Sequence, residues 1–159
     1  MTIRVLVADD QAMIRGALAG LLNLEHDIEV VAQAADGVQV LEELTRLTRQ
    51  NAPLDTIPTS SARPVSAVDV AIVDIEMPHM DGITTTEAIR ARFPGVRVLI
   101  VTTFGRPGYL QRALDAGATG FMVKNAPVEA LAEGVRTLAA GGRAIDQSLA
   151  VEALSAGSS

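Results

Sequence analysis

The run Val68-Asp69-Val70-Ala71-Ile72-Val73-Asp74 predicts a buried β-strand that ends on a carboxylate. A charged group at the end of a buried strand is unfavourable unless something at the edge of the sheet uses it. A second apolar run, residues 3–8, ends in the same way, at Asp9 and Asp10. If the two strands are parallel neighbours, three carboxylates meet at one edge of the sheet, where a divalent cation would offset their repulsion.

Strand and helix patterns alternate along the rest of the chain. Continuous apolar runs rich in Val, Ile and Ala are typical of parallel strands covered on both faces, and the intervening patterns predict helices. We therefore expect an α/β protein with a doubly wound, five-stranded parallel sheet and helices on both faces. The predicted strands cover residues 3–8, 28–34, 68–74, 96–102 and 119–123, and the predicted helices lie near 11–24, 37–49, 83–92, 107–116 and 127–140, with Gly141-Gly142 as a helix stop.

Composition restricts the possible functions. A chain of 159 residues that is 48% hydrophobic but only 3% aromatic predicts one domain with an aliphatic core. The net charge of -6 argues against nucleic-acid binding by this chain itself, and the lack of cysteine excludes disulfides and thiolate metal sites. Residues 1–4 lack the features of a signal peptide, and no apolar run approaches the ~20 residues that span a bilayer. We expect a cytoplasmic protein without membrane contact.

Residues 50–67 do not fit a minimal connection between a helix and a strand. Three prolines with Ser and Thr predict a loop, and its length exceeds the usual ~2–6 residues. The segment could be a contact surface for a partner or a tolerated insertion. We favour the insertion, because loops that lead from a helix into a strand lie at the opposite end of the sheet from the carboxylates.

Ligands bind such sheets at the carboxyl ends of the strands, and five polar residues fall at or just past these ends. The Asp pair could instead cap the following helix, but two in succession with a third on another strand favour a metal site. Oxygen ligands without His or Cys nearby indicate Mg²⁺, with Mn²⁺ possible. The five residues are Asp9, Asp10, Asp74, Thr102 and Lys124.

These groups suit phosphoryl transfer. Lys124 could be an ordinary surface lysine, but on the acidic edge it could pair with a carboxylate and then with a phosphate oxygen. Thr102 could donate its hydroxyl to a phosphoryl oxygen, and Asp74 would attack a phosphoryl donor to become an aspartyl phosphate. No phosphate-binding or dinucleotide glycine motif supports nucleotide binding, and His26 and His79 are too isolated to indicate a metal pair or a catalytic triad.

At this point the residues resemble the receiver domain of bacterial two-component response regulators. The matching segments occur in the family's order: residues 5–10, 74–82, 101–103 and 117–124. The resemblance implies a flavodoxin-like (CheY-like) fold with strand order 2-1-3-4-5. It also implies a phosphoacceptor that receives a phosphoryl group from a sensor histidine kinase. Such a domain is not an enzyme, although it assists its own phosphotransfer and dephosphorylation.

The resemblance implies a metal-binding role for four residues. Asp10 and Asp74 resemble the direct Mg²⁺ ligands, Asp9 would act mainly through water, and Glu76 would offer its backbone carbonyl. Asp74 resembles the phosphoacceptor itself.

The resemblance also implies a switch. Thr102 resembles the switch hydroxyl, Lys124 the lysine that contacts the phosphate, and Phe121 the switch aromatic, which is often Tyr. Phosphorylation would draw Thr102 toward the phosphoryl group, Phe121 would fill the vacated space, and residues 103–108 would change shape. Thr103 is an alternative switch hydroxyl in a shifted register.

Asn125 and residues 116–121 are similar to the NarL/FixJ subgroup, whose members usually carry a C-terminal LuxR-type helix-turn-helix. We expect residues 1–142 to form the receiver domain and residues 143–159 to begin an interdomain linker. The chain would then be the regulatory half of a transcriptional regulator, and DNA would be bound only through a helix-turn-helix that it does not contain. A stand-alone receiver is the alternative.

The predicted helix over residues 11–24 is apolar almost all round. An apolar outer face indicates an interface, so we expect a homodimer that uses this helix together with the helix near 127–140. The alternative is that the extra apolar side chains contact the 50–67 loop. The stripe expected to face the sheet is Ile14, Leu18, Leu21 and Leu22, and the stripe expected to face solvent is Met13, Ala17, Gly20 and Leu24.

Two other functions are open. A phosphohydrolase of the aspartyl-phosphate type usually has an acid two residues after its nucleophile, and Glu76 is so placed, but nothing in the sequence looks like a cap over a substrate pocket. A degenerate receiver would act as a phosphorylation-independent binding module. The complete acidic set with Lys124 argues against it.

Overall fold

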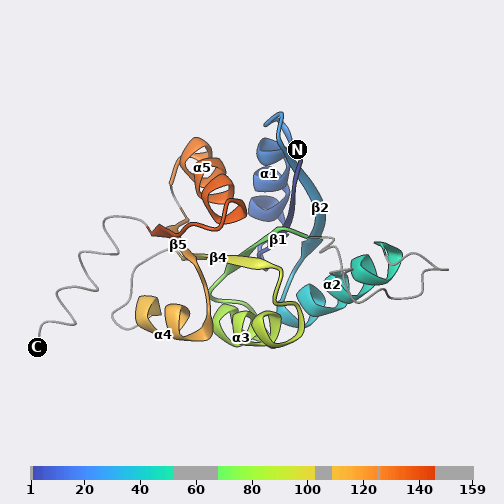
Figure 1. Ribbon diagram of the computed structural model, residues 1–159, viewed down its shortest axis with the longest axis vertical. Helices are drawn as coiled ribbons and strands as arrows, with labels where there is room; N and C mark the ends of the chain where they lie inside the picture. Colours follow the sequence, from blue (N-terminus) through green and yellow to red (C-terminus); the bar gives the residue numbers. More distant parts are fainter. Residues whose placement is uncertain (1, 52–67, 103–108, 125, 146–159) are drawn as a thin grey trace, which may run out of the picture.

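The computed structural model describes residues 2–51, 68–102, 109–124 and 126–145, and within them strands and helices alternate as expected (Figure 1). The strands are β1 (Ile3–Ala8), β2 (Ile28–Ala34), β3 (Val70–Asp74), β4 (Arg97–Thr102), β5 (Gly120–Val123) and β6 (Ala144–Ile145). The helices are α1 (Ala12–Asn23), α2 (Gly37–Asn51), α3 (Gly82–Arg92), α4 (Tyr109–Ala116) and α5 (Val128–Ala139).

The strands form one parallel sheet in the order β2-β1-β3-β4-β5-β6. The first five strands and their order confirm the prediction. The sixth strand was not predicted: Ala144 and Ile145 pair with Gly120 and Phe121 at the edge of the sheet. Two residues are too few to show a hydrophobic period, so the pattern of the sequence could not reveal this strand.

Helices cover both faces of the sheet, with α1 and α5 on one side and α2, α3 and α4 on the other (Figure 1). Side chains of a strand point alternately to the two faces. Thus Val5 and Val7 pack toward α1 and α5, whereas Leu6 and Ala8 pack toward the other three helices. All four are buried, which explains why the strands are continuously apolar.

The end of α5 confirms the helix stop predicted at Gly141-Gly142. Gly141 has a φ of 93°, a conformation that glycine adopts without a steric penalty. Its N–H donates to the carbonyl of Leu138, and the Gly142 N–H donates to the carbonyl of Thr137, both at 2.9 Å. This is the Schellman arrangement that satisfies the last carbonyls of a helix.

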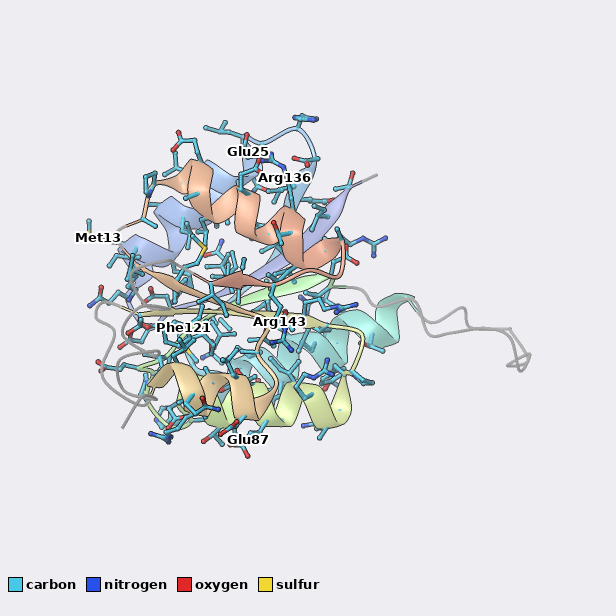
Figure 2. All side chains as sticks on the ribbon, turned by 60° about the vertical axis from the view of Figure 1, so that its left-hand side comes forward. Met13, Glu25, Glu87, Phe121, Arg136 and Arg143 are labelled. Atoms are coloured by element: carbon cyan, nitrogen blue, oxygen red, sulfur yellow. The ribbon has the colours of Figure 1, made fainter. Side chains whose placement is uncertain are left out.

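An ionic cluster ties α5 to the turn between α1 and β2. Arg136 donates from Nε and Nη2 to the two carboxylate oxygens of Asp27, at 2.8 and 2.9 Å. It also pairs with Glu25 and Glu133, and Figure 2 shows Arg136 beside Glu25. The bond with Arg136 lowers the pKa of Asp27 from 3.8 to about 2.

Several predicted boundaries are adjusted or lie outside the described residues. β3 begins at Val70 instead of residue 68, and α2 continues to Asn51, past the expected start of the 50–67 loop. Residues 52–67, 103–108, 125 and 146–159 lie outside the description. They include most of that loop, the switch segment and all of the expected linker after residue 145. In the described ranges, no helix is both long and apolar enough to cross a bilayer.

Candidate functional site

The parallel sheet brings the predicted polar residues to one edge. Asp9 follows β1 directly, Asp74 and Thr102 are the last residues of β3 and β4, and Lys124 follows β5 directly. These four strands are consecutive neighbours in the sheet. The Lys124 N–H donates to the carbonyl of Thr102 at 2.6 Å, which fixes the two strand ends in register.

Three carboxylates form the centre of the site. One oxygen each from Asp9, Asp10 and Asp74 lies within 4.8 Å of the others. Asp9 and Asp74 are buried, whereas Asp10 is exposed, so the cluster opens toward solvent on one side. Such a set of oxygen ligands suits Mg²⁺ or Mn²⁺, because these ions prefer carboxylates and Mg²⁺ keeps several of its own waters.

Lys124 balances part of this charge. Its Nζ lies 2.9 Å from Oδ2 of Asp9 and 3.0 Å from Oδ2 of Asp74. Burial alone would lower the pKa of Lys124, but the bonds to the two carboxylates raise it above its usual value, so the amine stays charged. Lys124 is also the only lysine in the sequence.

Asp74 is held in an environment that disfavours its charge. Burial raises the pKa of Asp74, and the nearby Asp9 raises it further, while the Lys124 ammonium opposes both effects. One ammonium therefore faces more negative charge than it can neutralise. A divalent cation at the same place would supply what is missing.

Asp9 shapes the turn into α1 without capping the helix. Its Oδ1 accepts a hydrogen bond from the Gln11 N–H at 2.9 Å, and its carbonyl accepts one from Nη1 of Arg15 at 2.8 Å. The N-cap of α1 is Gln11, which makes no side-chain capping bond. Asp9 thus helps to form the turn that precedes α1, but it is not the N-cap, and its Oδ2 pairs with Lys124 in the site.

The loop after β3 needs a glycine at position 82. The Gly82 N–H donates to the carbonyl of Ile75 at 2.9 Å, which closes the loop. A Cβ on Gly82 would lie 2.5 Å from the carbonyl oxygen of Asp74 and 2.8 Å from Cα of Ile75. Asp81 then caps α3 by accepting a hydrogen bond from the Thr84 N–H at 2.7 Å.

Three further predicted site residues are on the segments next to Asp74: Glu76 in the loop after β3, Thr102 at the end of β4, and Phe121 in β5. Glu76 is exposed, and its N–H lies 3.4 Å from Oδ1 of Asp74; its carbonyl as a metal ligand stays a prediction. Thr102 is buried. Phe121 is completely buried on the α4 side of the sheet (Figure 2), and its role as a switch aromatic stays a prediction. Thr103, the alternative switch hydroxyl, lies outside the described residues.

The outer face of α1 is exposed as expected, and it is wider than expected. Met13 and Leu24 are 89% and 79% exposed, and Ala17 and Gly20 are exposed as well. Met13 lies at the rim of the molecule in Figure 2.

The predicted sheet-facing stripe of α1 is only partly right. Leu22 is buried and Leu18 is half-buried, but Ile14 and Leu21 are 40% and 45% exposed. Ala19 is buried in their place, because residues 15, 18, 19 and 22 share the inner face of a helix with 3.6 residues per turn.

Three parts of the site were missed by sequence reasoning. They are the bond from Arg15 to the Asp9 carbonyl, the close approach of Gly82 to Asp74, and the bond between His79 and Asp36. Only Gly82 had a visible signal, since Asp-Gly before a helical pattern is typical of a tight turn into a helix.

Comparison with known proteins agrees with this geometry. The model of the response regulator receiver domain family matches residues 5–136. The transcriptional regulatory protein DesR of Bacillus subtilis is 37% identical over 141 residues, which are 89% of this chain and 60% of DesR. The oxygen regulatory protein NreC of Staphylococcus epidermidis is 35% identical over 147 residues, which are 92% of this chain and 59% of NreC.

The solved structures give the same result for the fold. A LuxR-family two-component response regulator from an Aurantimonas species superposes with a TM-score of 0.78 at 26% identity, covering 98% of this chain and 97% of that one. The chain spans only 59% to 64% of the length of the first curated relatives that it matches.

Proposed function

The chain belongs to the response regulator receiver domain family, and on that premise we propose that Asp74 accepts a phosphoryl group from a sensor histidine kinase. One observation carries the proposal. The buried Asp74 carboxylate lies at a strand end, bonded to Lys124 and clustered with the carboxylates of Asp9 and Asp10. A nucleophile, a cation-binding set and a fixed ammonium are the parts that phosphoryl transfer needs.

The transfer exchanges one bond to phosphorus for another. A carboxylate oxygen of Asp74 forms the new P–O bond while the P–N bond to the kinase histidine breaks. The imidazole leaves with the electron pair of that bond and takes up a proton. Lys124, now bonded to Asp74, would contact a phosphoryl oxygen, and the buried Thr102 at the neighbouring strand end would donate its hydroxyl to another.

Mg²⁺ is the proposed cofactor, with Mn²⁺ as a substitute. Asp9, Asp10, Asp74 and the backbone carbonyl of Glu76 would hold the ion, which when bound neutralises charge on the phosphoryl oxygens. The oxygen-only ligand set and the solvent-exposed side at Asp10 support this assignment.

We further propose that the chain is the regulatory part of a transcription factor. DesR is named as a transcriptional regulatory protein, and the chain spans 60% of its length. The receiver domain, expected over residues 1–142, would also include β6 (Ala144–Ile145), which adds to its sheet. A linker would begin after β6, and DNA would be bound by a helix-turn-helix outside this sequence. The location would be the cytoplasm, where a kinase could reach Asp74. The receiver would turn over no separate substrate.

A phosphorylation-dependent homodimer through α1 is the proposed output. The outer face of α1 exposes a row of apolar side chains that includes Met13 and Leu24. The half-buried Leu18 and the more exposed Ile14 line a small cavity together with Asp9 and Lys124. Helix α1 thus joins the site to the exposed face, which supports a link between phosphorylation and dimer formation.

The proposal is tested by the intact mass of the protein after incubation with acetyl phosphate and Mg²⁺. Wild type should gain one phosphoryl group, and Asp74→Asn should gain none. No gain by wild type would favour a phosphorylation-independent binding module. Repeated release of phosphate from a phosphomonoester would favour the phosphohydrolase.

A further inference from the structure

A loop of seven residues, 75–81, leads from the end of β3 at Asp74 into α3 and includes Glu76. Two backbone bonds fasten its ends: the Ile75 N–H donates to the carbonyl of Val101 at 3.0 Å, and the Gly82 N–H donates back to Ile75. Ile75 and Met77 are buried, so Glu76 lies between two fixed side chains.

His79 gives the far part of this loop an unusual turn. Its φ is 68°, the only positive φ of a non-glycine residue in the ranges that the structure describes. The Met80 N–H donates to the carbonyl of Pro78 at 2.7 Å, which closes a three-residue γ-turn around His79. Such turns with a positive φ are rare and strained, and strained backbone persists only where its surroundings hold it.

The holding contact is a bond to the other side of the site. Nδ1 of His79 lies 2.9 Å from Oδ2 of Asp36, a buried residue 43 positions earlier. Asp36 is itself fixed, because its Oδ1 accepts a hydrogen bond from the Gln39 N–H and its carbonyl accepts one from the Val40 N–H. The Gln39 amide and His79 lower the pKa of Asp36, so its carboxylate is ionised.

The segment that carries Asp36 also holds Asp9. The carbonyl of Ala34 accepts a hydrogen bond from the Asp9 N–H at 3.0 Å. Next to Asp36, a Cβ on Gly37 would lie 2.9 Å from Cβ of Met80, which shows how closely this segment meets the loop. Residues 34–37 therefore fasten both sides of the acidic cluster, Asp9 through Ala34 and the Glu76 loop through Asp36.

We propose that His79 is a positioning residue of the metal site, which through Asp36 holds the Glu76 loop at a fixed place relative to Asp9. The proposal rests on the proposed function of the acidic cluster. In this role His79 itself would contact neither the phosphoryl group nor the ion. Its loss would leave the ligands present but less well placed, and outer-shell losses of this kind typically weaken metal affinity about tenfold or more.

The first test measures Mn²⁺ affinity, with free Mn²⁺ followed by electron paramagnetic resonance. His79→Ala and His79→Gly should each raise the Mn²⁺ dissociation constant about tenfold. The glycine variant separates the two effects, because it relieves the backbone strain and still lacks the imidazole. Mn²⁺ affinity at the wild-type level in His79→Gly would overturn the proposal. His26→Ala is the matched control, because His26 is exposed as His79 is, and this variant should bind as wild type.

A double-mutant comparison tests the route through Asp36. In Asp36→Asn the amide oxygen can still accept the hydrogen bond from Gln39, but the carboxylate oxygen that lies against Nδ1 of His79 is replaced by an amide nitrogen. This variant should bind Mn²⁺ more weakly than wild type, and adding it to His79→Ala should have no further effect. Additive losses would mean that the two residues act separately, and the proposal would be wrong.

Phosphorylation by acetyl phosphate at varied Mg²⁺ separates positioning from folding. For His79→Gly the half-saturating Mg²⁺ concentration should rise about tenfold, with the rate at saturating Mg²⁺ within about twofold of wild type. A lower maximal phosphorylated fraction with unchanged Mg²⁺ dependence would indicate a merely structural role. If wild type itself takes up no phosphoryl group, the proposed function is wrong. If wild type is phosphorylated but His79→Gly needs no more Mg²⁺ than wild type, only this inference is wrong.

Discussion

At the level of one residue, Lys124 partly neutralises the carboxylate cluster in which a cation is proposed to bind. Two buried carboxylates, Asp9 and Asp74, share its single ammonium. Unpaired buried charge is strongly unfavourable, so the lysine stabilises the fold, although its one charge leaves part of the carboxylate charge unneutralised. Stability and cation binding should therefore be linked at this site.

Replacing Lys124 by methionine should expose that link. The substitution keeps the apolar stem and removes the charge, so without Mg²⁺ we expect a loss of about 3–5 kcal/mol in the free energy of unfolding. Added Mg²⁺ should stabilise the variant more than it stabilises wild type, because the ion replaces the missing charge. Thermal unfolding in EDTA and in Mg²⁺ measures both effects. Equal stability of the two proteins in EDTA would contradict the assigned role.

Gly82 should tolerate no side chain. In Gly82→Ala the new Cβ must push against the backbone of Asp74 and Ile75, so we expect a loss of about 1–3 kcal/mol and slower phosphorylation. Gly16→Ala is the matched control, because Gly16 is an exposed residue in the middle of α1 and a Cβ there would meet nothing within 4 Å. That change should stabilise the protein by about 0.5–1 kcal/mol. Chemical denaturation measures the change in the free energy of unfolding for both variants. If both changes had the same sign, the argument would be refuted.

The candidate site was predictable where it depends on strand ends and not where it depends on contacts between distant segments. Apolar runs that end on Asp9, Asp74 and Lys124 are visible in the sequence, and parallel strands bring such ends together. The bond between His79 and Asp36 joins residues 43 positions apart and leaves no periodic signal. His79 therefore looked isolated in the sequence.

At the level of elements, α5 is fastened to the opposite end of α1 from the site. Arg136 binds Asp27 with two hydrogen bonds and contacts Glu25 in the turn that follows α1 (Figure 2). The two helices that cover one face of the sheet are thereby joined at their C-terminal ends.

This ionic cluster should give the fold an acid-dependent stability. The pKa of Asp27 falls from 3.8 to about 2 in the folded protein, so the unfolded chain binds the proton more readily. The contribution is then complete above pH 3.8 and is lost as the pH falls toward 2. The melting temperature of wild type should exceed that of Asp27→Asn at neutral pH, and the gap should narrow below pH 4. A gap that stays constant down to pH 2.5 would argue against the pairing.

The elements differ in how well the sequence predicts them. Long apolar strands such as β1, β2 and β4 were placed to within a residue, because burial on both faces leaves a continuous signal. The inner face of α1 was placed less well, since a helix that is apolar almost all round has no clear hydrophobic direction. Leu21 was expected inside and is exposed, and the small Ala19 lies inside instead.

On the scale of the whole molecule, α1 begins just after Asp9 and Asp10 at the acidic edge and exposes its outer face to solvent. Charge placed on that face should disrupt a homodimer without reaching the site. Met13→Glu and Leu24→Glu, after phosphorylation with acetyl phosphate, should sediment as monomers where wild type sediments as a dimer. Val38→Glu, at a 42% exposed position on α2, is the control and should still dimerise. Dimers of all three variants would exclude this surface.

The single lysine has a further consequence for the molecule as a reporter of its own state. Reductive methylation with ¹³C-formaldehyde would label only the N-terminal amine and the Lys124 side chain. One methyl resonance would then belong to the acidic edge alone. Because the ammonium is bonded to both carboxylates, that resonance should shift when either the metal or the phosphoryl group arrives. The protein thus carries a built-in spectroscopic probe of the proposed phosphoacceptor site that requires no engineered substitution.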